Sequence, residues 1–148
     1  MNKKSVAALL AGGAFVAGVV VLQAVTRPGH KTQTTCPITG ESIDPHTSLH
    51  VDWEGQRVYF ATRAAADAFR KDPEAVFAKF ASDDIAPENI QTACPVSGEE
   101  LTGDNANGPT VNYKGRTIRL CCKKCPAEFE LDPARYLAKL PGDQVAEK

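Results

Sequence analysis

The stretch Thr35-Cys-Pro-Ile-Thr-Gly-Glu41 returns later in the chain as Ala93-Cys-Pro-Val-Ser-Gly-Glu99. The agreement continues downstream, because Val51-Asp-Trp-Glu-Gly-Gln-Arg-Val-Tyr-Phe60 corresponds to Val111-Asn-Tyr-Lys-Gly-Arg-Thr-Ile-Arg-Leu120. Agreement over so many positions indicates two copies of one supersecondary unit. This internal repeat therefore decides the predicted fold.

The repeat also divides the chain into segments. The polar residues that precede each copy have no hydrophobic period, which is typical of connecting chain. The predicted segments are a signal peptide or signal-anchor at 1–26, a tether at 27–35, a first repeat at 36–81, a linker at 82–92, a second repeat at 93–140 and a tail at 141–148.

Each repeat is expected to fold as a small ββα module, so the predicted class is α+β, with two tandem modules after an N-terminal hydrophobic helix. Glu54-Gly55 and Lys114-Gly115 each separate two short alternating apolar runs, a pattern typical of a hairpin with a glycine turn. Asp72 and Asp132 each precede a proline, as at a helix N-cap. The predicted helices are 64–71, 73–80, 123–131 and 133–140. The side chains expected in the core are Phe69, Phe77, Phe129 and Tyr136.

The two repeats differ most where the hairpin leads into the first helix. The second repeat has three cysteines there, Cys121, Cys122 and Cys125. The matching residues of the first repeat are Ala61, Thr62 and Ala65. Only the opening cysteine, Cys36 or Cys94, is present in both, so the second repeat is predicted to hold the ligands and the first only the scaffold.

Cys94, Cys121 and Cys125 are the predicted metal ligands. Cys121 and Cys125 are four residues apart and would project from one side of a helix, and Cys94 would join them from its Pro-Gly turn. Cys122 diverges from Cys121 by about 100° on a helix, so we expect it beside the site. Lys123, Lys124 and a helix amino terminus would lower the pKa of nearby thiols.

The thiolates favour Zn²⁺ or Cu⁺ as the bound ion. Zinc would require a fourth ligand, either Cys122 or water, whereas three sulfurs alone suit Cu⁺, and the residues do not choose between the two ions. Three other interpretations remain open. Cys94 would form a disulfide with Cys121 or Cys125. Alternatively, Cys121, Cys122 and Cys125 would form an exchanging thiol set, in which Cys122 and Cys125 have the Cys-x-x-Cys spacing, or His46 and His50 would join Cys36 in a second metal site.

The second repeat resembles the TRASH and YHS superfamily of small treble-clef-like metal-binding modules. The resemblance rests on Cys94-Pro-Val-Ser-Gly, Tyr113-Lys-Gly, Leu120-Cys-Cys-Lys-Lys-Cys125, Phe129 and Asp132-Pro-Ala-Arg-Tyr136. It implies that Cys94, Cys121 and Cys125 take the three ligand positions and that the role is the sensing, trafficking or resistance of heavy metals. The first repeat matches only as a scaffold, because it lacks the Cys-x-x-x-Cys pair.

Residues Val6 to Val25 form an apolar run of about 20 residues, enough for a helix to cross a membrane. Lys3 and Lys4 precede the run and favour a cytoplasmic start. We therefore expect a single-pass anchor in the inner or plasma membrane, with the rest of the chain periplasmic or extracellular. The alternative is a signal peptide that is cleaved to release the protein into the periplasm.

The composition is ordinary for a globular protein. A net charge of −1 and 43% hydrophobic residues give no indication of nucleic-acid binding. No Ser-His-Asp set, phosphate loop or carboxylate pair stands out, so an enzyme is not expected. The expected partners are the metal ion, the membrane and a protein to which the ion is transferred.

Overall fold

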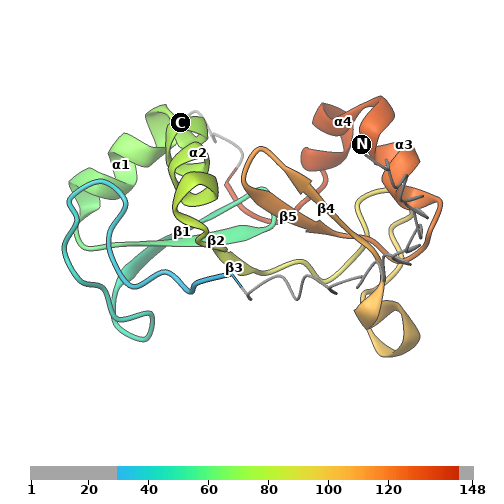
Figure 1. Ribbon diagram of the computed structural model, residues 1–148, viewed down its shortest axis with the longest axis horizontal. Helices are drawn as coiled ribbons and strands as arrows, with labels where there is room; N and C mark the ends of the chain where they lie inside the picture. Colours follow the sequence, from blue (N-terminus) through green and yellow to red (C-terminus); the bar gives the residue numbers. More distant parts are fainter. Residues whose placement is uncertain (1–29, 144–148) are drawn as a thin grey trace, which may run out of the picture.

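The structure is a computed structural model that describes residues 30–143 (Figure 1). It is a mixed α+β structure with small antiparallel sheets and helices, as the sequence predicted at this level. The predicted N-terminal hydrophobic helix lies outside the described residues, as do the first part of the tether and the last part of the tail. None of the helices within residues 30–143 combines the length and apolar character of a membrane span.

The hairpin of the first repeat, β1 and β2, is followed along the chain by two helices. A short strand from the predicted linker, β3, then pairs with β2 and completes a three-stranded antiparallel sheet in the order β1-β2-β3. Val51 of β1 pairs with Val58 of β2, and both side chains point into the core. The elements are β1 (Leu49–Trp53), β2 (Gln56–Phe60), α1 (Arg63–Lys71), α2 (Pro73–Asp83) and β3 (Glu88–Asn89).

The second repeat has the same hairpin and helix order, but its sheet has only two strands. Its extra residues form a single 3-10 turn before the hairpin. The elements are η1 (Gly103–Asn107), β4 (Thr110–Tyr113), β5 (Arg116–Arg119), α3 (Cys125–Leu131) and α4 (Pro133–Leu137).

Both hairpins close through the predicted two-residue glycine turns. Glu54 and Gly55 have φ values of 45° and 78°, and Lys114 and Gly115 have values of 48° and 80°. Two consecutive positive φ values define the turn type that matches the twist of paired strands. The prediction of short glycine turns is confirmed.

The helix boundaries follow from two capping aspartates. Asp72 Oδ1 accepts a hydrogen bond from the backbone N–H of Ala75 at 3.2 Å, and Asp132 Oδ1 accepts one from Arg135 at 3.3 Å. Both predicted N-caps are confirmed. Helix α3 begins at Cys125, two residues after the predicted start, because the chain just before it forms a tight turn rather than helix.

Each repeat has its own hydrophobic core between its hairpin and its helices. The four aromatic side chains predicted to be buried are at most 9% exposed, namely Phe69, Phe77, Phe129 and Tyr136. Phe69 contacts both Phe60 and Phe77 with ring centroids 5.3 and 5.8 Å apart. Burial of these rings is the main stabilising contribution in units this small.

The hairpins of the two repeats lie beside each other in the middle of the molecule (Figure 1), and Gln56 of β2 donates to Thr117 O of β5 at 3.1 Å. The backbone N–H of Gly55 donates to Pro141 O at 2.7 Å, beyond the last helix of the other repeat. Arg116 of β5 is fully buried and forms ion pairs of 2.7 Å with Glu54 and Glu74 of the first repeat. The second repeat is therefore held in a fixed position by the first.

Candidate metal centre

Cys94 is presented by a tight turn at the start of the second repeat. Its backbone N–H donates to Glu99 O, and its carbonyl accepts from Gly98, both at 2.8 Å. Gly98 has a φ of 82°, which a residue with a side chain adopts only with strain. The turn closes over the cysteine, so that Cys94 is only 1% exposed.

Cys121 enters the site from the end of β5. Just after β5, the backbone N–H of Leu120 donates to Pro109 O at 2.9 Å. The two segments lie so close here that a Cβ on Gly108 would be 1.9 Å from Leu120 O. Cys121 then turns inward and is 8% exposed. Its Sγ lies 3.1 Å from Ser97 Oγ, which belongs to the Cys94 turn.

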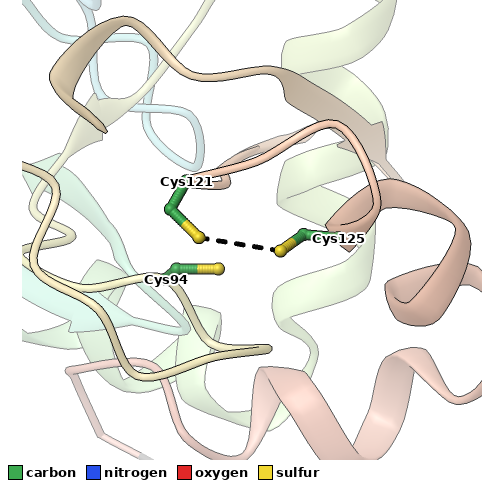
Figure 2. A group of neighbouring side chains, drawn as sticks. All are labelled: Cys94, Cys121 and Cys125. Carbon is green, nitrogen blue, oxygen red and sulfur yellow. Dashed lines mark hydrogen bonds between the residues drawn. The ribbon is translucent and has the colours of Figure 1, made fainter. Parts of the chain in front are cut away.

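Cys125 is the first residue of α3 and is 4% exposed. Its Sγ lies 3.7 Å from that of Cys121, and the sulfurs of Cys94, Cys121 and Cys125 all lie within 4.8 Å of one another. Figure 2 shows the three side chains converging from three separate segments. Sulfurs bound to one ion at about 2.3 Å are separated by about 3.8–4 Å, so this group needs only a small adjustment to hold a metal. The structure thus brings together the three predicted ligands.

Cys122 is exposed and lies outside this group of three sulfurs, where the sequence predicted it. Its Sγ nevertheless lies only 2.7 Å from that of Cys125. The prediction assumed that the chain turns helical at Cys121, so that the adjacent Cys122 would point away from it, and it made no statement about Cys122 and Cys125. The chain instead forms a turn in which the N–H of Cys125 donates to Cys122 O at 3.2 Å, and this turn brings the two thiols into contact.

The surroundings favour the thiolate form of Cys94. Burial raises the pKa of its thiol, but backbone N–H groups of Ser97 and Cys121 and the Ser97 hydroxyl together outweigh burial and lower the pKa to about 7. Burial and the neighbouring thiols raise the pKa of Cys125. The two largest contributions that lower the Cys94 pKa therefore come from the backbone N–H groups of Ser97 and Cys121, whereas the sequence suggested Lys123, Lys124 and a helix amino terminus as the groups that lower the pKa of the thiols.

In the first repeat a similar set of backbone N–H groups and a hydroxyl surrounds the sulfur of Cys36, and we call this set of groups the thiolate cradle. Cys36 is 1% exposed, its turn has the same backbone bonds to Glu41 and Gly40, and Thr39 stands where Ser97 does. Burial raises the Cys36 pKa, but the Thr39 hydroxyl and backbone N–H groups, including that of Ala61, lower it overall. Its neighbour at the start of α1 is Ala65, so the cradle holds one thiol and no second ligand.

The suggested second site at Cys36 is not formed. The His50 ring packs edge-on against Tyr59 with ring centroids 5.9 Å apart, and His46 bonds through its backbone N–H to Asp44. Within residues 30–143, the three thiols of the second repeat are the only such group of at least three potential ligand side chains that converge. All five cysteines are free thiols in this structure.

Ser97 is the site residue that the sequence reasoning missed. Its hydroxyl contacts Cys121 and its backbone N–H contacts Cys94, so it acts on two of the three thiols. The signal was present, because Thr39 and Ser97 occupy the same position of the repeated turn.

Comparisons with known proteins add no relative to this description. No family model matches the chain, and neither the curated proteins nor the solved structures include a match.

Proposed function

We propose that this protein binds one thiophilic metal ion through the thiolates of Cys94, Cys121 and Cys125. The observation that carries the proposal is the convergence of three nearly buried sulfurs, all within 4.8 Å, from a turn, a strand end and a helix start. Free cysteine is often buried as a small apolar residue, but the mutual approach of three thiols is the arrangement that a soft ion requires.

The donor set suits Zn²⁺ or Cu⁺. Three sulfurs alone would hold Cu⁺ in a trigonal site, and Zn²⁺ would take a fourth ligand from water or from Cys122. The Ser97 hydroxyl and the backbone N–H groups around Cys94 offset part of the surplus negative charge of three thiolates. A bound ion would also stabilise the second repeat by linking three segments of a small unit.

The wider proposal follows the resemblance to TRASH and YHS modules. The repeats would be two tandem treble-clef-like ββα modules, of which the second holds the ion and the first acts as a scaffold. The hairpin-then-helix order of both repeats supports this proposal. With the apolar N-terminal run, it describes an extracytoplasmic, membrane-anchored protein of metal trafficking, sensing or resistance, with a binding rather than a catalytic role.

Metal analysis of the purified, reduced full-length protein tests this function. We expect one equivalent of Zn²⁺ or Cu⁺ per chain, and Cys94→Ser, Cys121→Ser and Cys125→Ser should each abolish uptake. Cys122→Ser should lose far less, and Cys36→Ser serves as the control, because Cys36 is equally buried but belongs to the other repeat. Equal losses in all variants, or no uptake by the unmodified protein, would contradict the proposal.

A second candidate function is thiol–disulfide exchange at Cys122 and Cys125. The observation in its favour is the 2.7 Å separation of their sulfurs, of which one is exposed. In this reaction the two thiols lose two protons and two electrons to form a disulfide, and a disulfide-bearing partner is reduced to two thiols. Incubation of the metal-free protein with oxidised glutathione, followed by disulfide mapping, tests it. A protein that stays fully reduced would exclude this candidate.

A further inference from the structure

The four cysteines of the second repeat differ sharply in their access to solvent. Cys94, Cys121 and Cys125 are 1%, 8% and 4% exposed, whereas Cys122 is exposed. A metal ion that arrives bound to another molecule cannot be reached by three buried thiols without opening of the site. Cys122 is the one thiol of this group that a ligand outside the protein can approach directly.

Cys122 is also in contact with the buried group. Its Sγ lies 2.7 Å from that of Cys125, which is itself 3.7 Å from that of Cys121. The sulfur of Cys122 is nevertheless not one of the three that all lie within 4.8 Å of one another, which are those of Cys94, Cys121 and Cys125. An ion on Cys122 and Cys125 would therefore lie at the outer edge of the site, and an ion on Cys94, Cys121 and Cys125 would lie inside it.

This arrangement rests on the proposed metal site and extends it. We propose that Cys122 is the exchange thiol, which takes a soft ion from a thiol-bearing carrier at the surface and passes it to Cys94, Cys121 and Cys125. Cys122 is a transient ligand, and the three buried cysteines are the resting ligands.

The transfer is a series of ligand substitutions without a redox step. The Cys122 thiol loses its proton to solvent, and a bond from its sulfur to the metal forms as one bond to a carrier sulfur breaks. Cys125 and then Cys121 and Cys94 bond to the ion, each with release of its proton to solvent, while the remaining bonds to the carrier break. The bond to Cys122 breaks last, and the Cys122 thiolate takes up a proton from solvent. The carrier thiolate leaves and takes up a proton. The short distance between sulfurs allows each bond to form before another breaks.

The charge beside Cys122 indicates the kind of carrier. Lys123 and Lys124 follow it directly and are exposed, and neither forms an ion pair with any described residue. Two unpaired cations beside an exposed thiol favour an anionic carrier and increase its rate of encounter at low salt. We expect the carrier to present its thiolate next to acidic groups.

Stopped-flow transfer of Cu⁺ from its glutathione complex to the reduced full-length protein tests the proposal, because glutathione is an anionic thiol. Cys122→Ser should slow the transfer by about tenfold or more, because the ion then has to pass from glutathione to the buried thiols without the exposed intermediate ligand. Its equilibrium affinity, measured against a chromogenic Cu⁺ chelator, should stay within about threefold of the unmodified value. Lys123→Glu with Lys124→Glu should slow transfer at low salt and reverse its salt dependence, because the two new carboxylates repel the anionic carrier. Cys36→Ser, the matched control in the first repeat, should change neither quantity.

An unchanged transfer rate in Cys122→Ser would overturn the exchange role. A loss of affinity as large as that of Cys94→Ser would also overturn it, because Cys122 would then be a resting ligand. Both outcomes leave the proposed metal site intact. Failure of the unmodified protein to take up Cu⁺ or Zn²⁺ at equilibrium would instead reject the metal site itself, so the two failures are distinguishable.

Discussion

Gln91 holds Arg119 of β5 by the same two hydrogen bonds with which Gln33 holds Tyr59 of β2. The Gln33 amide donates to Tyr59 O at 2.7 Å and accepts from Tyr59 N at 2.9 Å. The Gln91 amide donates to Arg119 O at 3.3 Å and accepts from Arg119 N at 2.9 Å. Each glutamine amide bonds to the backbone N–H and C=O of one strand residue, as a residue of a neighbouring strand would. It thereby attaches the segment that precedes Cys36 or Cys94 to the second strand of the hairpin in the same repeat.

Gln91→Ala should destabilise the protein and weaken metal binding. The change leaves the N–H and C=O of Arg119 without their partner near a buried site, which costs about 1–3 kcal/mol of unfolding free energy. It also loosens Cys94 from the strand that leads to Cys121. Gln33→Ala is the matched control, with a similar loss of stability in denaturant unfolding but unchanged metal affinity. Equal effects of both variants on affinity would contradict this account.

The sequence predicted the parts of the fold that have local signals. The turns at Glu54-Gly55 and Lys114-Gly115 and the caps at Asp72 and Asp132 were found because each depends on the backbone preferences of a few adjacent residues. The repeat then allowed each observation to be checked against its copy. Gln33 and Gln91 were missed as structural residues, because a side chain that replaces a strand leaves no hydrophobic period in a polar segment.

The candidate site was predictable in its members but not in its geometry. The repeat pointed to Cys94, Cys121 and Cys125, since the second repeat adds cysteines at the junction where the first has alanine. The contact between Cys122 and Cys125 depends on a turn that begins α3 late, and helix boundaries are set by competition between nearly equal conformations. The packing of the repeats through Arg116 was not predictable either, because its partners Glu54 and Glu74 belong to the other repeat.

Gly115→Ala should separate the two repeats. A Cβ at this residue would lie 2.2 Å from Phe77 O, so the hairpin would have to move away from α2. Gly40→Ala is the control, because Gly40 has a similar φ of 76° but open space around it. We expect about 1 kcal/mol of backbone strain for Gly40→Ala and about 3 kcal/mol or more for Gly115→Ala in denaturant unfolding. Equal losses would mean that the hairpin contact contributes nothing to stability.

Asp52 should make stability depend on acid pH. The Arg57 guanidinium donates to both of its carboxylate oxygens, at 2.7 and 2.9 Å, and lowers its pKa below the ordinary 3.8. Because the pKa is lower in the folded state, this stabilisation is complete above the unfolded pKa and is lost as the pH falls through the folded one. Asp52→Asn should cost about 1 kcal/mol at pH 7 and less near pH 2. A loss that is the same at both pH values would exclude the ion pair as its cause.

The first repeat has the same turn around Cys36 as the proposed metal site has around Cys94, but it lacks two of the proposed ligands. The pKa of Cys36 is lowered by the Thr39 hydroxyl and by backbone N–H groups, including that of Ala61, against the raising effect of burial. This cradle corresponds to the one that Ser97 and Cys121 form around Cys94. Ala65 is 2% exposed and packs in the same core cluster as Cys36.

Ala61→Cys with Ala65→Cys should therefore create a three-thiol site with Cys36. In a protein whose Cys94, Cys121 and Cys125 are changed to serine, this double substitution should restore the binding of one Zn²⁺ or Cu⁺, measured by metal analysis. The restored binding should vanish on Cys36→Ser, because only the folded turn brings that thiol to the new pair. Ala61→Ser with Ala65→Ser is the matched control without new thiols. A folded double-cysteine variant that takes up no metal would show that the segments between hairpin and helix differ in backbone geometry between the two repeats. The arrangement of Cys94, Cys121 and Cys125 would then depend on the turn before α3.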